Sequence, residues 1–138
     1  MPTTLNAVYN GKKFHFTHYH LNDQNEFISV DKEPTEVKLD ELYRTSSADV
    51  VCFGHHHVIH HFKTKDRLYL NPGSLGCFHK PFASYAILSI GESGEIDVTL
   101  REVPYDNKQF LLGYLRLNVP DSEYILKIFH GNQQLRYM

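Results

Sequence analysis

A short apolar run in the middle of the chain places the strongest constraint on the fold. Residues 49–53 read Asp-Val-Val-Cys-Phe, and Gly54 follows directly. A half-buried strand alternates apolar and polar residues, so an unbroken short apolar run indicates a strand that is buried on both faces. Such a strand is typical of a sheet covered by helices. The run therefore favours the α/β class, with α+β as the neighbouring class.

Periodicity and turn signals predict the other elements. Strands are expected at residues 5–9, 12–18, 58–63, 67–70, 84–90 and 95–103, and helices at residues 35–45, 106–117 and from about 121 to Gly131. Asn10 and Gly11 are expected to join the first two strands, since both accept a positive φ in a two-residue hairpin. A tight turn is expected at residues 71–74, which read Asn-Pro-Gly-Ser. Either Asp121 or Ser122 is expected to cap the last helix.

Length and composition exclude several classes of protein. The 138 residues suggest a single domain over residues 1–138. Hydrophobic residues make up 41% and charged residues 22%, which excludes a disordered tail, a collagen-like repeat and a coiled coil. Apolar stretches fall short of the roughly 20 residues that span a bilayer, and the N-terminal residues lack a signal peptide core. We therefore expect a cytoplasmic protein without a membrane partner.

The charge balance argues against a nucleic-acid surface. Lys and Arg number 14 against 16 Asp and Glu, for a net charge of -2. Binding to a phosphate backbone depends on clustered Lys and Arg, and this balance provides no excess of either.

Histidines gather in two short windows of the chain. Eight of the ten lie in residues 15–20 and 55–61. Imidazole is the commonest metal ligand, and ligands in α/β sheets gather at the carboxyl ends of strands. Gly54 allows a sharp turn after the apolar strand, so that His55 and His57 can point toward one site. Neutral imidazoles from two such loops can hold a divalent transition metal.

Three segments together resemble one known family. Residues 48–57 resemble a Gly-His-x-His motif, residues 69–76 an Asn-Pro-Gly-Ser segment, and residues 16–18 the strand that precedes a single-histidine motif. In their order along the chain, these motifs are similar to those of calcineurin-like metallophosphoesterases, specifically their small bacterial phosphodiesterase branch. Residues 103–106, followed by two helices, also look like that branch. The resemblance runs along nearly the whole chain.

The resemblance implies a fold, an activity and a set of ligands. The fold would be a mixed sheet from the second half of a metallophosphoesterase β-sandwich, followed by two C-terminal helices. The activity would be hydrolysis of phosphate mono- or diesters by metal-activated water. His18 and His55 would ligate one metal of a two-metal centre, and His57 the other. The floor beside the substrate would be formed by Asn71, Gly73 and Ser74. The cofactor would be a divalent transition metal, namely Mn, Fe, Zn or Ni.

The chain departs from the family pattern at two points. Tyr19 stands where the family has a glycine after its single-site histidine. The sequence also contains no Asp-x-His, Gly-Asp or Gly-Asn-His motif, so no catalytic residue is predicted in it. The chain thus resembles only the C-terminal half of a metallophosphoesterase, truncated at its first hairpin. Three histidines can hold one ion with an open position, which makes a single bound ion the expectation.

Three functions remain open on these grounds. The first is a phosphoesterase with an incomplete site in this chain. The second is a non-catalytic metal-binding or oligomerising remnant that needs an N-terminal partner. Half of a sandwich exposes an apolar face, so a homo-oligomer is expected. The third is a cupin-like protein with a single metal, for which the relevant residues are His18, His20, Glu26, Pro72, Gly73 and His79.

Overall fold

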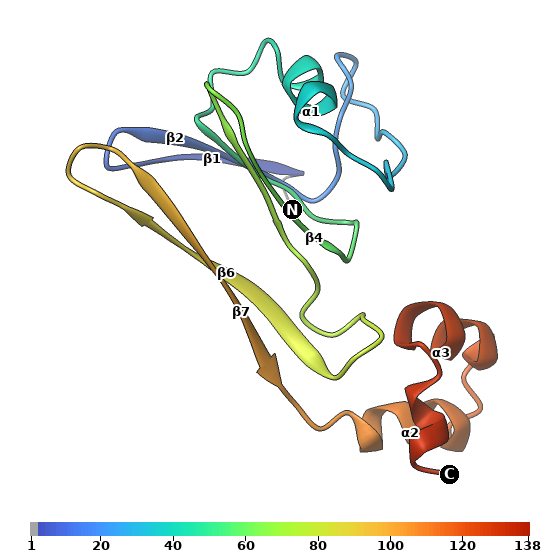
Figure 1. Ribbon diagram of the computed structural model, residues 1–138. Coiled ribbons are helices and arrows are strands. Elements are labelled where there is room, and N and C mark those ends of the chain that lie inside the picture. Colours follow the sequence, from blue (N-terminus) through green and yellow to red (C-terminus); the bar gives the residue numbers. More distant parts are fainter. Residues whose placement is uncertain (1–2) are drawn as a thin grey trace. The chain divides into compact units, whose positions relative to one another are not determined.

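The computed structural model describes residues 3–138, which form two compact units (Figure 1). The first unit runs to Gly73 and also includes Ala86–Thr99. The second unit comprises Ser74–Tyr85 and Leu100–Met138. The expectation of one domain over residues 1–138 stays a prediction.

The described residues belong to the mixed α/β class, as predicted. Their elements in chain order are β1 (Thr4–Tyr9), β2 (Lys12–Thr17), α1 (Glu36–Leu42), β3 (Val50–Cys52), β4 (Ile59–Lys63), β5 (Leu68–Pro72), β6 (Phe82–Ile90), β7 (Ile96–Pro104), α2 (Lys108–Arg116), α3 (Ser122–His130) and the 3-10 helix η1 (Gln133–Arg136). Each predicted strand and helix is therefore confirmed within a few residues of its expected bounds. The short helix η1 is an addition to the prediction.

A five-stranded mixed sheet forms the centre of the first unit. Its strand order is β1-β2-β3-β5-β4, and β6 pairs with β7 in a separate two-stranded hairpin. The strand β3 runs parallel to both of its neighbours, whereas β1-β2 and β4-β5 are antiparallel pairs. Asn10 and Gly11 have φ values of 46° and 77°, which confirms the expected turn between β1 and β2.

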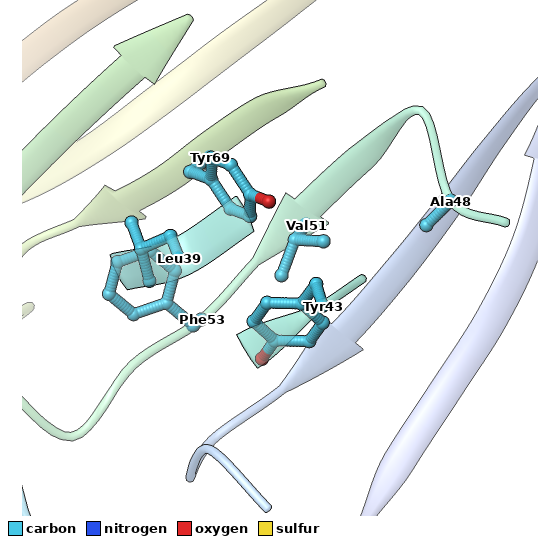
Figure 2. Close-up of a cluster of buried hydrophobic side chains, with 6 residues drawn as sticks. All are labelled: Leu39, Tyr43, Ala48, Val51, Phe53 and Tyr69. Carbon is cyan, nitrogen blue, oxygen red and sulfur yellow. The ribbon is translucent and has the colours of Figure 1, made fainter. Parts of the chain in front are cut away.

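The central strand β3 is buried on both faces, as the apolar run predicts. On one face Val51 packs with Tyr69 of β5, with Leu39 of α1 and with Tyr43, which directly follows α1 (Figure 2). On the other face Val50 packs in a second apolar cluster, whose other members are Phe14, Phe16, Cys52, Leu68, Leu70, Ala86, Leu88, Ile90, Ile96 and Val98. The helix α1 covers one face, whereas the part of the β6-β7 hairpin within residues 86–99 covers the other, so on the second face the cover is a strand pair and not the helix typical of such a sheet.

A half-buried arginine joins the segment after α1 to the sheet. The Arg67 guanidinium donates hydrogen bonds to the carbonyl oxygens of Tyr43 at 2.9 Å, Ser46 at 2.6 Å and Ala48 at 2.8 Å. It also donates to the Tyr69 hydroxyl at 3.1 Å. Because each of these acceptors would otherwise need water, the arginine satisfies the polar backbone of a segment that has no regular structure.

Two turn and cap predictions need correction. Asn71 and Pro72 lie within or at the end of β5, so the turn begins later than expected, at Gly73 with a φ of 89°. Asp121 occupies the N-cap of α3 but makes no side-chain cap hydrogen bond. Its φ of 54° is left-handed, whereas a capping side chain works from an extended backbone. Gly131 ends α3 in the left-handed conformation, as predicted.

The helices of the second unit enclose a small core of their own. Leu111 of α2 and Leu126 of α3 are fully buried. The buried Gln133 amide donates to the carbonyl oxygens of Phe78 and His130, both at 2.9 Å, and accepts from Asn107 at 3.1 Å. No helix in the described part of the chain has the length and apolar character needed to cross a membrane.

Candidate functional site

Two predicted ligands meet at the carboxyl ends of adjacent parallel strands. His18 directly follows β2, and His55 lies just beyond β3. Their ring centroids are 5.5 Å apart. The Gly54 N–H donates to the His18 carbonyl oxygen at 3.3 Å. A Cβ on Gly54 would lie 2.9 Å from Nδ1 of His18, so any other residue here would have to displace the His18 ring.

The third predicted ligand, His57, lies within electrostatic range of the other two. Burial lowers the pKa of His57, and His55, His18 and His56 lower it further, because neighbouring positive charges disfavour the imidazolium form. The structure therefore brings the three predicted ligands into one neighbourhood. Their role as metal ligands stays a prediction.

Asn71 shapes the loop that carries these histidines. Its side chain is completely buried. Its amide nitrogen donates to the carbonyl oxygen of His56 at 2.5 Å and to that of Gly54 at 3.4 Å, and its oxygen accepts from the Gly73 N–H at 2.9 Å. Between the two carbonyl contacts, His55 has a φ of 65°, which is uncommon for a residue with a side chain. Asn71 thus links Gly73 to the histidine loop through hydrogen bonds.

Ser74, the last residue of the predicted substrate floor, belongs to the second unit. Its hydroxyl oxygen accepts hydrogen bonds from the N–H groups of Cys77 at 2.8 Å and Gly76 at 3.3 Å. These contacts describe a local turn after β5. The substrate role of Asn71, Gly73 and Ser74 stays a prediction.

Tyr19 packs against both His18 and His55. The centroid of its ring lies 4.4 Å from that of His55, 4.5 Å from that of His18 and 4.6 Å from that of Phe27. The sequence already indicated this contact, because Tyr19 stands where the family pattern has a glycine. The glycine expected there has no side chain, whereas the tyrosine ring occupies space beside both imidazoles.

The donor set around these histidines does not match a two-metal centre. Among residues 3–138, no group of three or more His, Cys, Asp or Glu side chains is arranged to hold a metal ion. Two acidic side chains of the first unit have other partners: Asp31 pairs with Lys38 at 2.8 Å, and Asp49 accepts from the Lys13 N–H at 2.7 Å. Two adjacent dications repel each other strongly, and imidazoles alone bring no negative charge to offset this repulsion.

A second histidine cluster lines a cavity of about 290 Å³ in the first unit. Nε2 of His60 lies 2.8 Å from Nδ1 of His56, and Nδ1 of His20 lies 2.8 Å from the Tyr43 hydroxyl. Burial lowers the pKa of His20 to about 4, so its imidazole is neutral at neutral pH. This cavity was not predicted, because its walls come from segments that are distant in the sequence.

Family comparison agrees with the motifs. Residues 1–93 match the calcineurin-like phosphoesterase superfamily domain. The chain belongs to this superfamily. The cupin-like alternative is wrong, because the described sheet is mixed, with parallel pairs on both sides of β3, and is not an antiparallel barrel. No curated protein sequence shows significant similarity to the chain.

Solved structures share the fold at low sequence identity. The hypothetical protein PH1004 from Pyrococcus horikoshii OT3 is 19% identical, with a TM-score of 0.70 over 95% of this chain and 51% of that protein. Vps29 from Entamoeba histolytica, crystallised with Zn²⁺, is 20% identical, with a TM-score of 0.51 over 75% of this chain and 61% of that protein. The chain therefore spans about half the length of PH1004 and less than two thirds of this Vps29.

Proposed function

We propose that this chain carries the histidine ligands of a metal-dependent phosphoesterase, which hydrolyses phosphate mono- or diesters with metal-activated water. The observation that carries the proposal is the meeting of His18 and His55 at the ends of two adjacent parallel strands, 5.5 Å between ring centroids. Membership of the calcineurin-like phosphoesterase superfamily supports it. His57 on the same loop completes the set of three imidazoles.

The site is incomplete within residues 3–138. In the described residues no group of three or more His, Cys, Asp or Glu side chains, these three histidines included, is already arranged to hold a metal ion. In this proposal the mixed sheet corresponds to the second half of a metallophosphoesterase sandwich, and the carboxylates come from a partner polypeptide segment. The chain by itself then holds one divalent ion at most, of Mn, Fe, Zn or Ni, since three imidazoles leave a fourth position open.

Metal titration of the full chain tests the proposal. Zn²⁺ is added while the ring signals of the histidines are followed by NMR, and hydrolysis of bis(p-nitrophenyl) phosphate is measured with Mn²⁺ in parallel. We expect the signals of His18, His55 and His57 to shift until one ion is bound per chain, without hydrolysis. His55→Ala should abolish this binding. His61→Ala, at an exposed position on β4, is the matched control and should leave it unchanged.

Two results would contradict the proposal. If His55→Ala and His61→Ala bound Zn²⁺ equally well, the histidine loop would not be the metal site. Hydrolysis by the chain alone that is lost on removal of the metal would support the phosphoesterase activity. It would contradict the proposal that the site in this chain is incomplete.

A second candidate function is self-association without catalysis. The second unit exposes large apolar side chains on and after its helices, among them Phe110, Leu117, Tyr124, Ile128 and Leu135. Leu117 is 71% exposed and Leu135 is 63% exposed. Exposed apolar patches favour association, and a second copy of the chain is a partner that is always present. Sedimentation at micromolar concentration should show dimers that Leu117→Gln weakens, and a monomer at all concentrations would argue against this function.

A further inference from the structure

The cavity behind the histidine loop has the size of a small ligand site. It lies in the first unit, where α1, the loop of residues 20–34 and the loop between β3 and β4 meet. Its volume is about 290 Å³. A cavity of roughly 150 Å³ accommodates one benzene ring, so this one has room for two fused rings.

The walls of the cavity are apolar and aromatic. Ile28, Val30 and Leu42 supply aliphatic surface. The rings of Phe53 and His60 lie nearly parallel, with centroids 6.1 Å apart and an angle of 15° between their planes. The His20 ring lies 4.6 Å from that of Phe53. Flat side chains in this arrangement favour a flat ligand, because offset stacking adds to the burial of apolar area.

The polar groups of the cavity suit a ligand with ring heteroatoms and no net charge. Both His20 and His60 line the cavity, and their described hydrogen bonds involve only one ring nitrogen of each, Nδ1 of His20 and Nε2 of His60. A neutral imidazole can donate or accept through such a nitrogen. The charged residues of the lining, Asp31 and Lys38, are exposed and pair with each other at 2.8 Å. Their charges therefore offset each other, and the ligand needs no charge of its own to balance them.

We propose that this cavity binds a flat, uncharged heteroaromatic group of two fused rings, the size of a purine base. Gly54, His55 and His56 also line the cavity, so the predicted ligand His55 belongs to its wall. Resting on the proposed phosphoesterase function, the cavity then defines the substrate class as a nucleoside phosphate ester. In this arrangement the base of the substrate occupies the cavity, and the phosphate group of the substrate lies on the side of His55.

Ring binding is tested without metal and without phosphate. The full chain is titrated with adenosine in the presence of EDTA, and with cyclohexylmethanol as an aliphatic probe, while backbone amide signals are followed by NMR. We expect saturable shifts at residues of the cavity with adenosine and much weaker ones with cyclohexylmethanol. Because metal is absent, this result does not depend on the success of the phosphoesterase proposal.

A pair of matched variants locates the binding. His60→Leu removes a ring from the cavity wall, whereas His61→Leu makes the same exchange at the next residue, which is exposed and does not line the cavity. We expect His60→Leu to weaken adenosine binding about fivefold or more, as the loss of one stacking ring implies, and His61→Leu to leave it unchanged. Val30→Trp, which fills the cavity, should also abolish binding.

Three results would overturn the proposal. The first is the absence of saturable shifts at the cavity in a folded chain. The second is equal affinity for cyclohexylmethanol, which would show an apolar hole without preference for a flat heteroaromatic ring. The third is an equal effect of His60→Leu and His61→Leu, which would place adenosine elsewhere.

Discussion

The buried side-chain amide of Asn71 donates a hydrogen bond to the carbonyl oxygen of His56 at 2.5 Å. A second contact of the same amide reaches the Gly54 carbonyl oxygen, so Asn71 is tied to both neighbours of His55. His55 itself has a left-handed backbone, which costs about 1–2 kcal/mol for a residue with a Cβ. The amide of Asn71 therefore stabilises a loop conformation that the local sequence disfavours.

Replacing Asn71 with alanine should lower the free energy of unfolding by about 1–3 kcal/mol, because two carbonyl oxygens and the Gly73 N–H lose their buried partner. Urea denaturation measures the change. Asn6→Ala is the control: Asn6 is exposed and its side chain contacts Nδ1 of His15, so its loss should cost less than about 0.5 kcal/mol. Equal losses in the two variants would refute a special role of Asn71.

Replacing Arg67 with lysine should also be costly, by about 1–3 kcal/mol. A lysine ammonium carries its three donors on one nitrogen and does not reach the separate carbonyl oxygens of Tyr43, Ser46 and Ala48, which bond to three different nitrogens of the flat guanidinium. Arg44→Lys is the matched control, since Arg44 is 53% exposed and makes two surface ion pairs, worth about 0–1 kcal/mol, and one long hydrogen bond of 3.5 Å to the Glu41 carbonyl oxygen. Thermal or urea unfolding of both variants measures the two changes in stability. A small loss of stability in Arg67→Lys would mean that water replaces the hydrogen bonds of Arg67.

Exchanging Tyr19 for glycine should strengthen Zn²⁺ binding if His55 is a ligand. The tyrosine ring lies 4.4 Å from the His55 ring, and such an aromatic pair contributes about 0.5–1.5 kcal/mol. Freeing His55 from this contact should raise the affinity by about twofold to tenfold, measured by calorimetric titration. Tyr19→Phe keeps the ring and should behave like the parent chain. An unchanged affinity in a folded Tyr19→Gly variant would show that the ring does not compete with the metal.

The second unit should lose stability as the pH falls. Burial lowers the pKa of His130 from its ordinary value of 6.5, and His79 lowers it further. Below pH 6.5 the unfolded chain therefore binds a proton that the folded chain does not, so the free energy of unfolding decreases from there toward the folded pKa. Above pH 6.5 both states are neutral at this residue and its contribution is complete.

Hydrogen exchange of amides in α3, measured at several pH values, checks this expectation. His130→Leu should flatten the pH dependence, because it removes the titrating group from a buried position. The exposed His61 serves as the control, and His61→Leu should leave the slope as it is. A slope that persists in His130→Leu would assign the effect to another histidine.

Local signals were read correctly from the chain. The hairpin at Asn10 and Gly11 depends on two adjacent residues that tolerate a positive φ, and Gly131 ends α3 for the same reason. The rings of Phe14 and Phe16 stack with their centroids 5.9 Å apart, because residues two apart in a strand lie on the same face. The predicted side-chain cap of α3 was wrong, because Asp121 at the N-cap has a left-handed backbone, which the type of residue alone does not reveal.

The strands and helices, the buried character of β3 and the superfamily motifs could be predicted from the amino-acid sequence, since these depend on neighbouring residues and on periodicity. The cover of β3, the contact of Asn71 with a loop 15 residues away, and the rings around the cavity of His20, Phe53 and His60 became known from the three-dimensional packing. The reason is physical: contacts between distant segments depend on how whole elements pack, and no spacing along the chain encodes that packing directly.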